Sequence, residues 1–184
     1  MVVSNFAEDL DKSLYAGDGG PARYAKENAV LKASAVYQRL SGEASGDKSN
    51  KPLVVVGSDT IVDLDGLILE KPATPEEACA TLRRLSGRGH LVHSGVSIFT
   101  SASGPEQPRV AFTTTTHVCF GDLSDADIEA YVASGEPMDK AGSYGIQGLG
   151  GQLVDRIEGC YFNVMGFPMR RFATEFSTVL NEGC

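Results

Sequence analysis

LVVVGSDTIV (residues 53–62) places an apolar, β-branched run directly before Gly57-Ser58-Asp59-Thr60. Such a run is typical of a buried strand, and the small polar residues behind it predict that the strand ends there. In open α/β folds, ligands bind beyond the carboxyl ends of the strands. The stretch therefore predicts that the Asp59 carboxylate and the Thr60 hydroxyl stand at a ligand-binding edge of a sheet. On this feature alone, the alternative that Asp59 and Thr60 merely cap a turn stays open.

Outward from this stretch, helical and strand patterns alternate along the chain. Thr74 and Ser124 have the features of helix N-caps, and Asp65-Gly66 predicts a hairpin turn. A polar segment at residues 41–52 predicts a surface loop. The alternation predicts one α/β domain over residues 1–184, with a sheet flanked by helices. The predicted helices span residues 21–40, 75–85, 124–133 and 168–180, and the predicted strands span residues 53–56, 61–62, 67–69, 91–100, 110–120 and 152–157.

Composition excludes several classes of function. The chain has 16 Lys and Arg against 24 Asp and Glu, a net charge of −8, which argues against binding a nucleic acid polymer. No apolar run approaches the roughly 20 residues that span a bilayer, so no membrane segment is expected. The four cysteines form no CxxC pair, and the N-terminus lacks the pattern of a secretory signal. We therefore expect a cytoplasmic protein with reduced thiols.

Three further features are candidates for binding a ligand. Lys71-Pro72 could place an ammonium group beside a phosphate, and Lys32 lies close to the apolar positions of its predicted helix. Taken singly, an ordinary surface position is the favoured interpretation of each lysine. Residues 134–148 combine glycines with charged groups, and Gln147 offers a donor and an acceptor suited to a base edge. Function is favoured for this loop over a bare connection.

His90 and His93 are weaker candidates. They stand three residues apart in a predicted strand, a spacing that puts them on opposite faces. We therefore expect no metal-binding histidine pair here.

Several motifs together resemble the Maf family of nucleoside triphosphate pyrophosphatases, also called septum-formation inhibitor proteins. The resemblance covers nearly the whole chain, from about Ser4 onward. It implies the Maf/ITPase-like fold, a mixed twisted sheet flanked by helices. The motifs are Gly57-Ser58-Asp59-Thr60, Glu70-Lys71-Pro72, Leu85-Ser86-Gly87-Arg88 followed by His90, Ser94-Gly95-Val96, DKAGSYGIQG at residues 139–148 and NVMGFP at residues 163–168.

The resemblance implies a reaction and a set of roles. A nucleoside triphosphate would be hydrolysed to the monophosphate and pyrophosphate with Mg²⁺ or Mn²⁺, and a homodimer is compatible with the family. Asp59 would be the proton acceptor. The resemblance further implies that Lys32, Lys71 and Lys140 neutralise phosphate charge, that Glu8 and Asp59 lie at the metal, and that Thr60 and Gln147 set specificity as in the dTTP/UTP subgroup.

One departure from the family pattern concerns the first strand and phosphate loop, which in the family carry a Ser-Pro-Arg-Arg-like motif. This motif is not found in the sequence, where MVVSNFAE (residues 1–8) matches the segment that normally follows it. We therefore expect an N-terminally truncated domain whose sheet lacks that strand. The alternative to pyrophosphatase activity is a catalytically impaired protein that binds nucleotides or has a regulatory role.

Overall fold

The fold is seen in a computed structural model, which describes residues 4, 6, 10–44 and 53–182. Short 3₁₀ turns precede α1 and follow α3, at Lys12–Tyr15, Glu136–Asp139, Ala141–Ser143 and Leu149–Leu153. The helices are α1 (Gly20–Ala44), α2 (Pro75–Leu85), α3 (Asp125–Ala133), α4 (Tyr161–Val164) and α5 (Met169–Asn181), and the strands are β1 (Val54–Leu64), β2 (Leu67–Leu69), β3 (Gly89–Thr100), β4 (Val110–Phe120) and β5 (Val154–Glu158).

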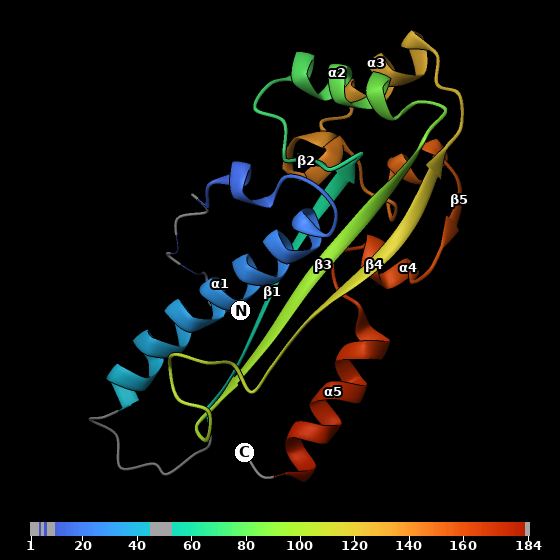
Figure 1. The fold of residues 1–184 in the computed structure, drawn as a ribbon. Coiled ribbons are helices and arrows are strands. Elements are labelled where there is room, and N and C mark those ends of the chain that lie inside the picture. The colour runs from blue at the N-terminus through green and yellow to red at the C-terminus, as the bar shows by residue number, and fades with distance from the viewer. Residues whose placement is uncertain (1–3, 5, 7–9, 45–52, 183–184) are drawn as a thin grey trace.

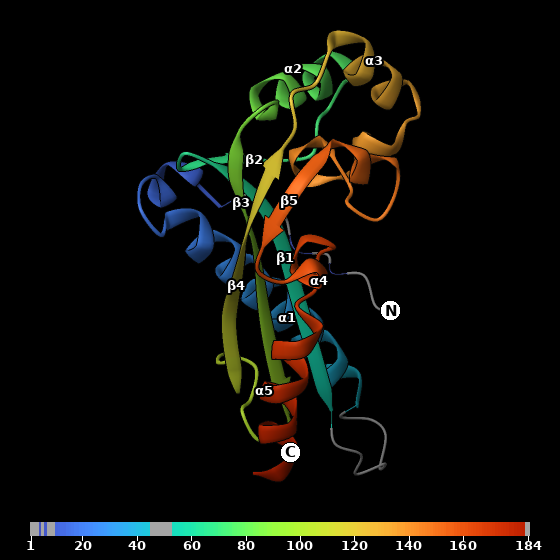
Figure 2. The same ribbon diagram turned by 90° about the vertical axis from the view of Figure 1, so that its right-hand side faces the viewer.

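The described strands form one five-stranded sheet in the order β2-β1-β3-β4-β5. Every described pair is antiparallel, and Asp59 of β1 lies opposite Gly95 of β3. Figure 1 shows α1 along one face of the sheet, with α2 and α3 together at one end. Figure 2 shows α4 and α5 on the opposite side from α1. The predicted α/β fold with flanking helices is confirmed, as is the hairpin turn at Asp65-Gly66, which joins β1 and β2.

Helix α1 packs closely on β1 and β3 because glycines face it. A Cβ atom at Gly95 would lie 2.3 Å from the carbonyl oxygen of Ala25, and one at Gly57 would lie 2.4 Å from that of Ala29. Both distances are far below van der Waals contact, so any larger residue would push the helix away. Further along, Tyr37 and Phe99 are buried between the helix and the sheet.

Strand β1 differs from the sequence prediction, because it runs unbroken from Val54 to Leu64. The predicted strand end at Gly57-Ser58-Asp59-Thr60 is wrong, and Asp59 lies in the middle of the strand. Glycine and aspartate are rare in strands, but here tertiary contacts outweigh that propensity. Among the described residues, positions 54–61 pair with β3 only, so this part of β1 is an edge of the described sheet.

Other boundaries differ less. Helix α1 continues to Ala44, so the first residues of the predicted loop are helical, whereas residues 45–52 lie outside the described part of the chain. Strand β5 begins at Val154 rather than at Gln152, which lies in a 3₁₀ turn. The predicted caps are present: Thr74 accepts a hydrogen bond from the Glu77 amide, and Ser124 forms a capping box with Asp127. Among the described residues, no helix is both long enough and apolar enough to span a bilayer.

Candidate active site

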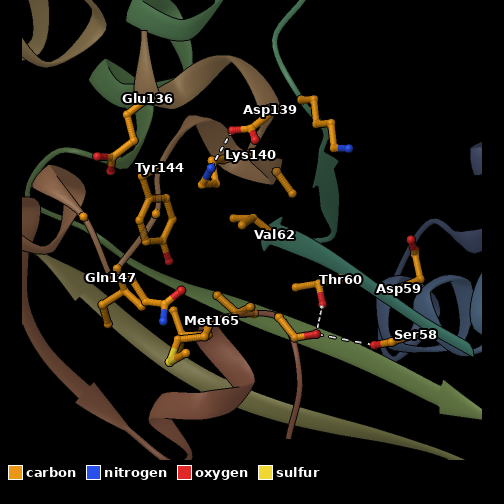
Figure 3. Close-up of a pocket in the computed structure, with 18 residues that line it drawn as sticks. Ser58, Asp59, Thr60, Val62, Glu136, Asp139, Lys140, Tyr144, Gln147 and Met165 are labelled. Atoms are coloured by element: carbon orange, nitrogen blue, oxygen red, sulfur yellow. Dashed lines mark hydrogen bonds and ion pairs between the residues drawn. The ribbon is translucent and has the colours of Figure 1, made fainter. Parts of the chain in front are cut away.

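A cavity of about 540 Å³ opens between β1 and the segment that follows α3 (Figure 3). Its walls come from five segments of the chain. The lining includes Ser58, Asp59, Thr60 and Val62 of β1, Lys71 after β2, Val92 of β3, Glu136 to Gly148 in part, Val164 at the end of α4, and Met165 and Gly166 after it. The polar stretch of β1 and the glycine-rich loop that the sequence singled out therefore face the same space.

A second, smaller cavity of about 310 Å³ lies beside the first, and Asp59, Thr60, Lys71 and Ala141 line both. Here Lys32 of α1 forms an ion pair with Asp59, with Nζ 2.6 Å from Oδ1. The two side chains are only 19% and 9% exposed, so water screens this pair far less than a surface pair. Lys32 thus fixes the orientation of the Asp59 carboxylate at the junction of the two cavities.

Thr60 follows Asp59 but points to the other face of the sheet, as alternation along a strand requires. Its hydroxyl donates to the carbonyl oxygen of Gly166 (3.1 Å) and lies 2.8 Å from Ser94 Oγ. Ser58 also donates to the Gly166 carbonyl, at 3.4 Å. Figure 3 shows these bonds joining β1 to the segment after α4. The floor of the cavity is therefore held by hydroxyl groups rather than by apolar packing.

Charged side chains of both signs line the two cavities. Lys71 lines both cavities, and Lys140 lines the larger one from the glycine-rich loop. Lys140 Nζ lies 2.5 Å from Asp139 Oδ1, and this hydrogen bond lowers the pKa of the Asp139 carboxyl. Together with Lys32, three ammonium groups border the two cavities, beside the carboxylates of Asp59, Glu70 and Asp139. Glu8, the other residue expected at a metal, lies outside the described residues.

The far end of the larger cavity is suited to a flat, partly apolar group. Val62, Val92, Val164 and Met165 line it, beside Gln147. Figure 3 shows the Gln147 amide and the Tyr144 hydroxyl turned toward the same part of the cavity.

Tyr144 is held by His90, whose Nε2 lies 2.8 Å from the tyrosine hydroxyl. Burial raises the pKa of Tyr144 and lowers the pKa of His90 to about 4. Both side chains are therefore uncharged at neutral pH.

The other histidine considered above, His93, has different partners, Asp63 (3.2 Å) and Thr115 (2.8 Å). Over the part of the chain that the structure describes, no group of three or more His, Cys, Asp or Glu side chains is arranged to hold a metal. No individual role was predicted from the sequence for Glu136, Tyr144, Ser94 or Asn163. Glu136 and Tyr144 lie in the glycine-rich run that drew attention as a whole, and Ser94 and Asn163 each begin a motif that carries the resemblance.

Comparison with known proteins places the chain among relatives. The family described as "Maf-like protein" matches residues 1–179. The human "Probable bifunctional dTTP/UTP pyrophosphatase/methyltransferase protein" is 46% identical over 95% of this chain and 28% of its own length. The "dTTP/UTP pyrophosphatase" of Clostridium beijerinckii is 38% identical over 93% of the chain and 82% of its own length. That of Thermococcus onnurineus is 46% identical over 92% of the chain and 80% of its own length.

These matches agree with the geometry. Four of the six motifs that carried the resemblance in the sequence meet around the two cavities: the middle of β1, the Lys71 turn, the glycine-rich loop and the Gly166 segment. The chain belongs to the Maf-like protein family.

Proposed function

We propose that the protein hydrolyses nucleoside triphosphates, with dTTP and UTP as substrates, to the nucleoside monophosphate and pyrophosphate. The observation that carries the proposal is the placement of Asp59 between two cavities bordered by Lys32, Lys71 and Lys140. The names of the relatives, dTTP/UTP pyrophosphatases, support the same reaction.

In this reaction a water molecule attacks the α-phosphorus, and the bond from that phosphorus to the bridging oxygen breaks. Asp59 accepts the proton of the water, because it is the carboxylate at the junction of the cavities. The lysines balance the charge that builds up on the phosphate oxygens and on the leaving pyrophosphate. Lys32 holds the Asp59 carboxylate in one orientation, so the base is positioned before the substrate arrives.

The proposed cofactor is Mg²⁺ or Mn²⁺. Mg²⁺ is usually bound by one or two carboxylates together with substrate phosphates and water. Asp59 offers such an oxygen donor, so the residues around the cavity fit an ion shared with the triphosphate. When bound, the ion supplies charge neutralisation and orients the phosphate oxygens. The role of Glu8 as a further ligand stays a prediction.

The proposed preference for thymine and uracil follows from the far end of the larger cavity. Gln147 carries both a donor and an acceptor, which match the N3–H and O4 groups of these bases. The valines and Met165 beside it offer an apolar surface for the ring and for the thymine methyl group. The cytoplasmic location and the homodimer expected from the sequence stay predictions, and light scattering on the purified protein checks the second.

The test is an assay of pyrophosphate release from dTTP, UTP, CTP, GTP and ATP with Mg²⁺ or Mn²⁺. We expect dTTP and UTP to be preferred, and Asp59→Asn to lower kcat at least about 100-fold by removing the base. Asp155→Asn, the same change at an exposed position of β5, is the matched control and should keep full activity. Orthophosphate as the only product, or full activity of Asp59→Asn, would refute the proposal. Nucleotide binding without turnover would support the binding or regulatory role instead.

A further inference from the structure

Glu136 lines the larger cavity, yet its carboxylate is directed to the loop rather than to the open space. Oε2 accepts the Leu149 amide at 2.9 Å, and Oε1 accepts the Gly150 amide at 3.1 Å. Oε1 also accepts the Tyr131 hydroxyl, at 3.0 Å. Both oxygens are thus occupied by donors of the protein itself, which leaves little capacity for a metal ion or a water nucleophile.

Tyr131, buried on α3, extends this arrangement to the other side of the loop. Its hydroxyl oxygen accepts the Gly145 amide at 3.1 Å while its proton goes to Glu136. Tyr131 therefore holds the backbone at Gly145, two residues before Gln147. Glu136 holds the backbone at Leu149 and Gly150, two and three residues after Gln147. Close approach is possible because the loop is rich in glycine: a Cβ atom at Gly148 would lie 2.2 Å from Glu136 Oε2.

Gln147 itself is exposed at the tip of this loop. None of the hydrogen bonds found among the described residues involves its side chain, so the backbone on either side determines where its amide can be. A base-reading amide must be placed accurately, since misplacement by a fraction of an ångström weakens its hydrogen bonds.

We propose that Glu136 and Tyr131 are positioning residues that hold the Gly145–Gly150 loop, and that through Gln147 they set discrimination between nucleobases. This proposal rests on the proposed function and adds to it two residues that touch no substrate. Glu136 is then neither a metal ligand nor a base, although it is a carboxylate in the cavity wall.

The charge states fit this role. Burial would raise the pKa of Glu136, but the amides of Gly150 and Leu149 outweigh it and lower that pKa. Burial raises the pKa of Tyr131, so its hydroxyl keeps its proton. At neutral pH an ionised acceptor therefore meets neutral donors, which makes these hydrogen bonds charge-assisted and strong.

The kinetic test uses Glu136→Gln, which leaves one acceptor oxygen, and Tyr131→Phe, which removes only the hydroxyl. Each should reduce the preference for UTP over CTP and raise KM for UTP by about tenfold, with a change in kcat below about threefold, because one hydrogen bond of this kind is lost. Glu129→Gln, the same change at an exposed position of α3, should change neither. In a Gln147→Ala background, Glu136→Gln should add no further loss of discrimination, since both act through one side chain.

A second measurement needs no turnover. In the nucleotide-free protein, hydrogen exchange followed by NMR should show the Leu149 and Gly150 amides exchanging about tenfold faster in Glu136→Gln than in wild type, and unchanged in Glu129→Gln. If wild type releases no pyrophosphate, the proposed function fails while this measurement still tests the loop contacts. Unchanged amide exchange in Glu136→Gln, or a collapse of kcat with KM and discrimination intact, would overturn the positioning role.

Discussion

Asp59 and Thr60 are neighbours in β1, but their side chains point to opposite faces of the sheet. The Asp59 carboxylate meets Lys32 on the α1 side, whereas the Thr60 hydroxyl meets Gly166 on the other side. Both can line the same two cavities because this part of β1 is an edge among the described residues. A strand in the middle of a sheet would separate the two groups by its own backbone.

At Lys32, we expect Lys32→Met to lower kcat for pyrophosphate release by about 100-fold, as loss of one preorganised charge at a reaction centre typically does. Lys32→Arg keeps the charge and should recover part of the rate, although the guanidinium has a different shape. Steady-state kinetics with dTTP measure both variants. A kcat for Lys32→Met within twofold of wild type would show that the ion pair is not needed for turnover.

Asn163 is a fully buried residue whose effect should be on stability. Its Nδ2 donates to the Val92 carbonyl (3.0 Å) and to Thr116 Oγ1 (3.1 Å). Asn163→Leu removes both hydrogen bonds, although Thr116 Oγ1 keeps the Cys160 amide as a donor, and should lower the free energy of unfolding by about 1–3 kcal/mol. Urea denaturation checks this, with the exposed Asn181→Leu as control. A loss below about 0.5 kcal/mol, the range of neutral surface changes, would mean that the site relaxes.

At the scale of elements, the contact between α1 and the sheet leaves no room for a side chain larger than that of glycine at Gly57 and Gly95. Gly95→Ala would place a methyl group 2.3 Å from the Ala25 carbonyl oxygen. Overpacking of this kind typically costs about 1–3 kcal/mol, and the melting temperature should fall accordingly. The control is Gly42→Ala in α1, where the new Cβ has no described atom within 4 Å. This variant should keep or raise the melting temperature because alanine favours helix. Equal melting temperatures for the two variants would contradict the close packing.

Local sequence signals were sufficient for the elements whose ends carry caps or turns. Thr74, Ser124 and Asp65-Gly66 each mark a boundary through contacts within a few residues, so they could be read without the fold. The predicted end of β1 was wrong because Gly57 makes room for α1, a contact with residues 24–28 positions earlier in the chain. The roles of Glu136 and Tyr131 were missed for the same reason, since their partners lie 13–14 residues along the chain.

At the scale of the whole molecule, stability should depend on pH through buried histidines. Burial lowers the pKa of folded His90 from 6.5 to about 4, and burial lowers that of His93 despite Asp63 beside it. Between pH 6.5 and 4 these histidines bind protons in the unfolded chain but stay unprotonated in the folded protein. Stability is therefore full above pH 6.5 and falls as the pH drops toward 4, by about 3 kcal/mol for His90 alone.

Urea denaturation at pH 7.5, 6 and 5 measures this slope, and an NMR titration of the His90 ring in the folded protein tests its cause. A folded His90 that titrates near 6.5 would remove His90 from the explanation, even if the slope were observed. The remaining slope would then have to come from His93 and the carboxylates.

The short distance between α1 and the sheet gives a way to change the turnover rate of this protein. Lys32 reaches Asp59 because Gly57 and Gly95 let the helix backbone come as near as a backbone can. A methyl group at either glycine would lift the ammonium from the carboxylate without altering any polar atom. Rate can thus be tuned from two positions that have no functional group at all, and a survey of inherited or engineered variants that inspects only charged residues would overlook them.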